Sequence, residues 1–169
     1  MPHKSLTPER VLAMLAEGPA RIAAATAGLS PERLHAAPGT GQWSANDVLA
    51  HLRACADVWG GYMATMLAQD RPSFRAISPR SYIHRTGYSQ QAFDPSFQAF
   101  ARQRTELLAV LRALTPEQWQ RGAVVPPAGR VRQPTVLSYA QRLALHEREH
   151  LEQIERLAQF ADAANHREQ

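Results

Sequence analysis

The stretch SANDVLAHLRACADVWGGYMATMLAQ, residues 44–69, decides the fold class of this chain. Ser44 can cap a helix, and Asp47 three positions later is close to a capping box. The apolar side chains that follow recur at intervals of three and four residues, which is the period of one helix face. They are Val48, Leu52, Cys55, Trp59, Tyr62, Met63 and Met66. We therefore expect a long amphipathic helix over residues 44–69.

Three further segments repeat apolar residues with the same period, and a polar tail follows the last of them. Thr7 as N-cap and Pro8 at the first helical position begin the first of these segments. The three segments cover residues 8–28, 93–114 and 135–160. Four long amphipathic helices with almost no strand signal predict an all-α four-helix bundle. We expect one domain over residues 1–169, with its core at about 8–160.

The connections between these helices predict their directions. The links after the first and the third helix are short enough to join ordinary neighbours. Residues 70–90 form an unusually long connection, which can reach along the whole bundle and let the third helix run parallel to the second. We therefore expect the order up, down, down, up. Residues 121–134 predict a short extended ribbon with a turn at Ala128–Gly129.

Composition and charge exclude several classes of protein. The chain has 169 residues, of which 44% are hydrophobic and 20% charged, as in ordinary globular domains. It lacks the roughly 18–20 consecutive apolar residues of a membrane span and an apolar signal-peptide core, so we expect a cytoplasmic protein without a membrane partner. Its 19 basic residues are mostly spread at helical spacings among Glu, Gln and Ala, so we expect no nucleic-acid partner.

Three histidines fall on apolar helix faces. His146 and His150 are four residues apart, so their side chains lie on the same face of one helix, and His51 lies on the apolar face of residues 44–69. Buried imidazoles need partners, which are either hydrogen-bonding groups or a shared metal ion. Three neutral imidazoles would leave a divalent ion an open coordination position, as in a catalytic site. Cys55, one turn after His51, is a candidate fourth ligand, nucleophile or core residue.

A competing motif overlaps the histidine pair. His146–Glu147–Arg148–Glu149–His150 also matches the HExxH pattern of zinc proteases, in which the glutamate is the general base. Only 19 residues follow His150, however, and they do not provide the downstream third ligands of the metzincin pattern. We therefore do not favour a protease, but we keep Glu147 as a candidate catalytic base.

Two segments together resemble a known family. GQWSANDVLAHL, residues 41–52, and HEREHLEQIE, residues 146–155, are similar to the DinB-like superfamily, which includes YfiT-like metal hydrolases, bacillithiol S-transferases and mycothiol-dependent maleylpyruvate isomerases. The resemblance covers about residues 8–160 and implies a four-helix bundle with a long crossover between helices two and three. By position, His51, His146 and His150 resemble the metal triad of the family, which implies nickel or zinc, or else manganese or iron. It also implies a homodimer as a candidate assembly.

The resemblance and the histidines together lead to a functional hypothesis. We expect a metal-dependent transferase that joins a low-molecular-weight thiol of the bacillithiol type to a small-molecule electrophile through a metal-bound thiolate. Arginines of two loops, Arg85, Arg130 and Arg132, are the candidate substrate-binding residues for carboxylates of the thiol. One alternative is a hydrolase of a small amide or ester, which uses metal-bound hydroxide and Glu147 as base. Another is a non-catalytic bundle that binds a small ligand in a stress response.

Overall fold

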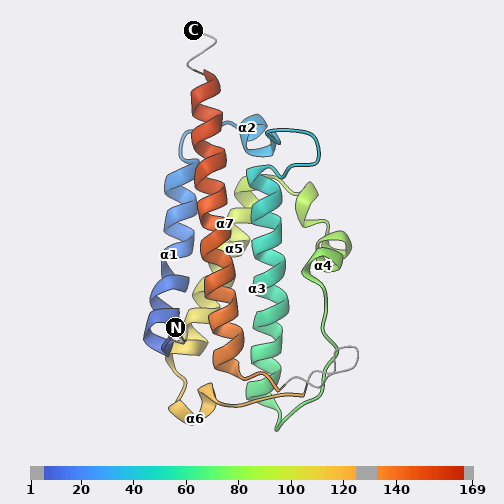
Figure 1. Ribbon diagram of the computed structural model, residues 1–169, viewed down its shortest axis with the longest axis vertical. Coiled ribbons are helices and arrows are strands. Elements are labelled where there is room, and N and C mark those ends of the chain that lie inside the picture. The colour runs from blue at the N-terminus through green and yellow to red at the C-terminus, as the bar shows by residue number, and fades with distance from the viewer. Residues whose placement is uncertain (1–5, 125–132, 166–169) are drawn as a thin grey trace, which may run out of the picture.

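The computed structural model describes residues 6–124 and 133–165. Its four long helices are α1 (Pro8–Thr26), α3 (Ala45–Ala68), α5 (Phe93–Arg112) and α7 (Val136–Asn165) (Figure 1). The shorter elements are α2 (Pro31–His35), α4 (Pro79–Thr86), the 3₁₀ turn η1 (Tyr88–Gln90) and α6 (Pro116–Trp119). The prediction of an all-α four-helix bundle is confirmed.

The four long helices form a square in which α1 and α3 occupy opposite corners. Each of these two helices packs against both α5 and α7. In Figure 1, α1 and α7 run upward, whereas α3 and α5 both run downward. The bundle therefore has the predicted order up, down, down, up, and residues 69–92 return along the outer side of α3 to connect its end with the start of α5.

This crossover contains a helix that the sequence pattern did not reveal. We expected residues 70–90 to be a loop, but α4 occupies Pro79–Thr86. Both ends of α4 have residues that are typical of helix ends, because Pro79 begins the first turn and Gly87 ends the helix at a φ of 68°. Its eight residues include no buried side chain, and Tyr82 and Ile83 are its only large apolar side chains, so the segment is too short and too polar to show a period over several turns.

Hydrogen bonds attach the crossover to the side of α3. The side-chain amide of Asn46 donates to the backbone carbonyls of Ser89 and Gln91, both at 3.1 Å. The hydroxyl of Tyr88, the first residue of η1, donates to the Asp57 carboxylate of α3 at 2.6 Å. These bonds hold α4 and η1 next to the N-terminal half of α3, which carries His51.

The bundle core has two apolar clusters with a polar layer between them. One cluster includes Leu15, Leu108 and Leu143, and the other includes Ile22, Phe100 and Leu151. On α1, α5 and α7, the buried residues between these pairs are small or polar. The residues of this layer are Gly18 on α1, Arg104 on α5, His51 and Cys55 on α3, and His146 and Glu147 on α7. A buried layer of this composition needs partners for its polar groups, and these partners define the functional site.

Two sequence predictions concern the region around α6 and α7. The turn predicted at Ala128–Gly129 lies outside the described residues, while the described ends of the predicted ribbon make an antiparallel bridge between Gly122 and Thr135. The last helix continues to Asn165 instead of ending near residue 160. Residues 161–165 contain neither glycine nor proline, so nothing in them terminates a helix. Within residues 6–124 and 133–165, no helix combines the length and hydrophobicity needed to cross a membrane.

Candidate metal site

The capping box at the start of α3 determines where His51 lies. The Ser44 hydroxyl accepts a hydrogen bond from the Asp47 backbone N–H at 3.1 Å, and the Asp47 carboxylate accepts from the Ser44 N–H at 2.9 Å. This reciprocal pair satisfies helix donors that would otherwise lack partners. The helix therefore begins at Ala45 and turns His51 into the bundle, where its side chain is 8% exposed.

The cap of α7 has the same role for the other two histidines. The Thr135 hydroxyl accepts from the Ser138 N–H at 3.1 Å, and the Ser138 hydroxyl oxygen accepts from the Thr135 N–H at 2.9 Å. From this start the helix presents His146 and His150 on one side, as their spacing predicts. That side faces α3, which packs closely against α7.

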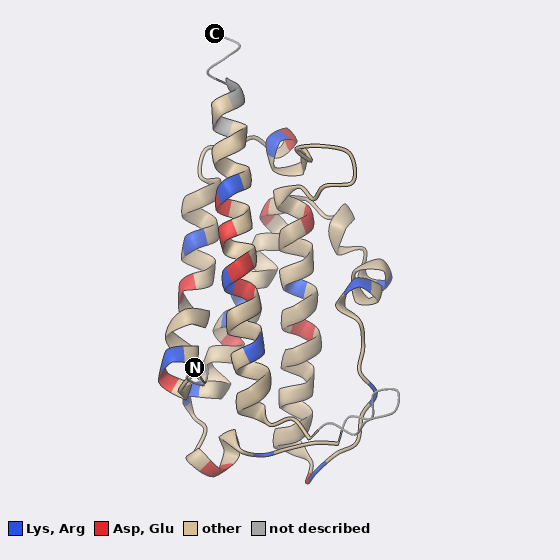
Figure 2. Ribbon diagram, in the orientation of Figure 1, with Lys and Arg blue, Asp and Glu red and all other residues tan. Residues whose placement is uncertain are grey.

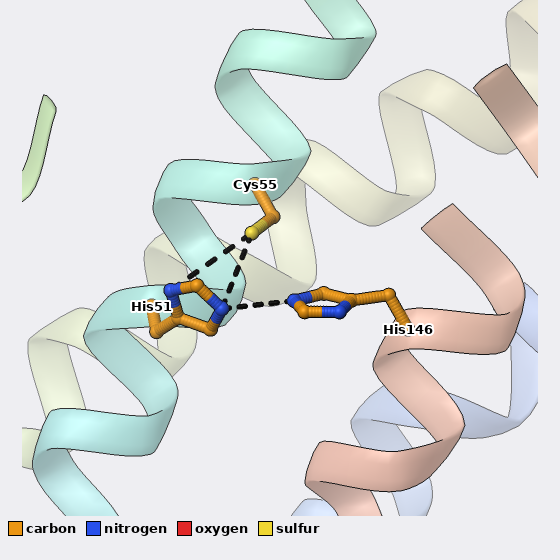
Figure 3. A group of neighbouring side chains, drawn as sticks. All are labelled: His51, Cys55 and His146. Atoms are coloured by element: carbon orange, nitrogen blue, oxygen red, sulfur yellow. Dashed lines mark hydrogen bonds between the residues drawn. The ribbon is translucent and has the colours of Figure 1, made fainter. Parts of the chain in front are cut away.

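The three predicted ligand residues come together between α3 and α7. The ring centroids of His51 and His146 are 5.0 Å apart, those of His51 and His150 are 4.7 Å apart, and those of His146 and His150 are 4.5 Å apart. The Nε2 atoms of His51 and His146 point toward each other at 2.8 Å (Figure 3). This distance requires a proton on one of the two nitrogens, so the pair shares one hydrogen bond.

Cys55 lies beside the same two rings. Its Sγ atom is 3.6 Å from Nε2 of His51 and 4.0 Å from Nδ1 of that ring (Figure 3). Donor atoms of Cys55, His51 and His146 all lie within 4.8 Å of one another. Two donors on one tetrahedral zinc ion are about 3.3–3.6 Å apart, given the usual metal–nitrogen and metal–sulfur bond lengths. The donors of this group therefore fit a divalent metal ion after small movements of the rings.

Burial keeps the imidazoles in the state that a metal requires. Burial, with smaller contributions from the charges of His150, His146 and Arg80, lowers the pKa of His51 to about 4. The pKa of His146 is also lowered, mainly by burial and then by His150. Both rings are thus neutral at pH 7 and can offer a lone pair. Burial raises the pKa of Cys55 to about 12, so its thiol is protonated and is not a nucleophile by itself.

A hydrogen bond orients His150. Its Nδ1 atom is 2.8 Å from Oε1 of Gln153, one turn later on α7. Because an amide oxygen only accepts, Nδ1 carries the proton and Nε2 keeps the lone pair. Fixing the outer nitrogen of a histidine in this way is typical of metal ligands. The contact of Gln153 with His150 thus favours a role in orienting this ring.

Aromatic rings form the walls of the site. The Trp43 ring lies 5.2 Å from the His51 ring and 6.2 Å from the His150 ring, measured between centroids. On the other side, Trp59 lies 5.2 Å from His146. Trp43 precedes α3 and is half-buried, whereas Trp59 is buried in the core. The histidines are thus shielded by indole rings, which strengthens electrostatic interactions inside the site.

Glu147 has a partner that the sequence did not suggest. Both of its carboxylate oxygens accept hydrogen bonds from the guanidinium of Arg104 on α5, and the same guanidinium donates to the Leu15 carbonyl of α1. Both side chains are 1% exposed. A Cβ atom added at Gly18 would overlap the Glu147 carboxylate, so the glycine makes room for this pair.

This pairing changes the interpretation of the HExxH pattern. A general base must be free to accept a proton from a water molecule or substrate near the metal. The Glu147 carboxylate instead lies against α1 and α5 and is committed to Arg104, while His146 and His150 face α3. The geometry therefore favours a structural role for Glu147 over the predicted catalytic one.

The predicted substrate-binding arginines are placed differently from one another. Arg130 and Arg132 lie outside the described residues. Arg85 is exposed on α4, and its guanidinium lies 5.4 Å from the centre of the Tyr82 ring. Arg80, one helical turn earlier, has its guanidinium 5.9 Å from the centre of the Trp43 ring, beside the histidines. Arg80, in the crossover, thus lies near the site. Its position could not be predicted, because residues 70–90 were expected to form a loop and not to contain helix α4.

Comparisons with known proteins agree with this architecture. The sequence profile of the DinB superfamily matches residues 14–154. A solved structure, described as "YfiT from Bacillus subtilis is a probable metal-dependent hydrolase with an unusual four-helix bundle topology", is similar with a TM-score of 0.77 and 20% sequence identity. The similarity covers 94% of this chain and 91% of that one. Among curated proteins, none matches the chain.

Proposed function

Because the chain belongs to the DinB superfamily, we propose that it is a metal-dependent enzyme in which His51, His146 and His150 hold a divalent ion. The observation that carries this proposal is the convergence of three imidazole rings from α3 and α7. Two of them are held neutral by burial, and the third is oriented by Gln153. Nickel and zinc suit an imidazole-rich set of this kind best, and manganese or iron would bind less strongly.

We further propose that the reaction is the transfer of a low-molecular-weight thiol to an electrophile. A bound divalent ion would favour the thiolate form of the cosubstrate at neutral pH. In the reaction the sulfur forms a bond to carbon, the leaving group departs with the electron pair of the broken bond, and the thiol proton passes to solvent. The chain itself needs to supply only a shielded site and an anchor for the thiol. We assign the reaction to the cytoplasm, where small thiols are kept reduced.

One contact supports this reaction over hydrolysis. A metal-dependent hydrolase of an amide or ester commonly uses a carboxylate as base beside the metal. The carboxylate predicted for that purpose, Glu147, is instead engaged by Arg104. Thiol transfer does not require such a base, because a metal ion can itself favour loss of the thiol proton. The likeness to the YfiT structure concerns the fold and is compatible with either reaction.

The first experiment measures bound metal by elemental mass spectrometry on tag-free protein purified without chelator. We expect near-stoichiometric metal in the wild type and its loss in His51→Ala, His146→Ala and His150→Ala. His35→Ala is the matched control, because His35 is exposed on α2 and should leave metal content unchanged. Absence of metal after reconstitution with nickel, zinc and manganese would overturn the metal assignment.

A second experiment identifies the reaction. The loaded protein is incubated with bacillithiol, mycothiol or glutathione and a fluorogenic alkyl halide, and separately with a small chromogenic ester and anilide. We expect thiol conjugation that exceeds the uncatalysed rate and disappears in His146→Ala. Hydrolysis of the ester or anilide without thiol conjugation would contradict thiol transfer and would support the hydrolase alternative.

A further inference from the structure

We infer that a hollow between the start of α3 and helix α4 binds an anionic group of the thiol cosubstrate, and that Arg80 is the residue that recognises it. The inference rests on the proposed thiol transfer and specifies the substrate class, a small thiol that carries a carboxylate. The hollow has a volume of about 480 Å³ and is lined by residues that include Trp43, Asp47, Arg80 and His84.

The first argument is position. Trp43 lines the hollow and also lies 5.2 Å from the His51 ring, so one side chain borders both the hollow and the histidines. Arg80 lies on α4, and its guanidinium is 5.9 Å from the centre of the same Trp43 ring. A small molecule whose sulfur lies at the histidines could therefore extend past Trp43 and place a second group at Arg80.

The second argument is that the Arg80 charge is available. Within the described residues, Arg80 makes no ion pair or hydrogen bond, and its guanidinium lies 5.9 Å from the centre of the Trp43 ring. The single acid lining the hollow, Asp47, already accepts two hydrogen bonds from Ser44 in the capping box. A guanidinium without an acidic partner, seated near an aromatic ring, is well suited to a carboxylate, to which it can donate two parallel hydrogen bonds.

The third argument is the contrast with Arg85. This residue lies on the same short helix and is also exposed, but its guanidinium lies near Tyr82 and it does not line the hollow. Figure 2 shows both basic positions on α4, beside α3. The crossover bonds of Asn46 and Tyr88 hold this helix against α3, so the position of Arg80 relative to Trp43 is maintained by the fold. Arg85 therefore provides a matched control of equal charge.

The first test uses metal-free protein, so it does not depend on the proposed metal. The three tryptophans are labelled with ¹⁵N, and Trp43→Phe assigns the Trp43 indole signal. Titration with succinate should shift this signal, whereas neutral succinamide should not. Arg80→Met should weaken succinate binding about 3- to 10-fold, the size expected for one charge-assisted contact at a partly exposed site. Arg85→Met should bind as the wild type does.

Two results would overturn the inference. One is a Trp43 signal that succinate leaves unchanged in the wild type. The other is an Arg80→Met variant that binds succinate as tightly as the wild type while its Trp59 and Trp119 signals, which report the buried core, stay native.

A second arm separates this inference from the proposed function. Cobalt-loaded protein is titrated with mercaptosuccinate and with neutral thioglycerol, and the sulfur-to-cobalt absorption band gives each Kd. We expect tighter binding of mercaptosuccinate, with the preference reduced in Arg80→Met and kept in Arg85→Met. Failure to bind cobalt would refute the proposed metal site and leave the succinate titration to decide the anion site. Equal affinities for the two thiols would refute the anion site alone.

Discussion

His146 and Glu147 are neighbours on α7, yet they lie in opposite kinds of surroundings. Glu147 faces α1 and α5, where both of its oxygens are hydrogen-bonded to Arg104. His146 faces α3, where its Nε2 shares a single hydrogen bond with another imidazole, that of His51. We call the first side complete because both carboxylate oxygens are hydrogen-bonded and the two charges balance, although Nε of Arg104 has no hydrogen-bond partner. We call the other side incomplete because it presents neutral nitrogen atoms that a metal ion could bind. Buried polar groups without a partner are uncommon, and a role in binding is one reason for a fold to keep them.

The largest effect should come from breaking the complete side. Glu147→Gln leaves the Arg104 cation buried without its counter-charge, so we expect the free energy of unfolding of the metal-free protein to fall by about 3–5 kcal/mol. Urea unfolding measures this loss. The double variant Arg104→Met, Glu147→Leu should recover most of it, because apolar residues of similar size can replace a buried pair. A loss below about 1 kcal/mol for Glu147→Gln would show that the pair is dispensable.

The incomplete side should respond to metal instead. At a metal concentration 100-fold above its Kd, we expect binding to stabilise the wild type by about 2.7 kcal/mol. His146→Ala should lose this gain, since it removes one of the donors beside His51. Thermal unfolding with and without nickel or zinc measures the difference. Equal metal-dependent stabilisation in the wild type and the variant would contradict the role of His146.

The pH dependence of the free energy of unfolding of the metal-free protein tests the same comparison. Because folding lowers the pKa of His51 from 6.5 to about 4, the unfolded state binds more protons between these values. The part of the free energy of unfolding that depends on His51 is therefore fully present above about pH 6.5. It should decrease as the pH falls toward 4, by up to about 1.4 kcal/mol per pH unit for this one proton. Urea unfolding at a series of pH values should show a shallower slope for His51→Gln. An unchanged slope would mean that other groups cause the dependence.

The smallest effect should come from an ion pair on the surface. Arg21 and Glu155 join α1 and α7 through hydrogen bonds of 2.8 and 2.9 Å, but both side chains are about one-third exposed. Glu155→Gln should reduce the free energy of unfolding by less than about 1 kcal/mol, because solvent screens the pair. Comparing its urea midpoint with that of Glu147→Gln isolates the effect of burial. Similar losses for the two variants would show that burial is not what makes the Arg104 pair important.

Much of the fold could be predicted from local sequence. Each long helix has an apolar face with the expected period, and the caps at Thr7 and Ser44 lie where the pattern placed them. The length of the crossover also predicted its path, because a chain of about twenty residues is what a return along the bundle requires. Helix α4 was missed because it is only eight residues long and has only two large apolar side chains, Tyr82 and Ile83.

The convergence of His51, His146 and His150 followed from the same local reasoning. Each lies on an apolar face, and faces of this kind meet in a bundle, so the sequence by itself determined that the three rings would point toward the same region between the helices. The sequence also determined the all-α class and the order of the helices. It further determined that the site would consist of imidazole rings with one cysteine thiol nearby.

Tertiary structure decided what no local pattern contains. Arg104 and Glu147 are 43 positions apart, and only the packing of α5 and α7 against α1 brings the guanidinium to the carboxylate and the carboxylate to the space left by Gly18. The choice of Arg80 over Arg85 likewise depends on how α4 is attached to α3. Periodicity specifies which way a side chain points from its own helix, but the partner it meets depends on the relative rotation and height of helices that are distant in sequence.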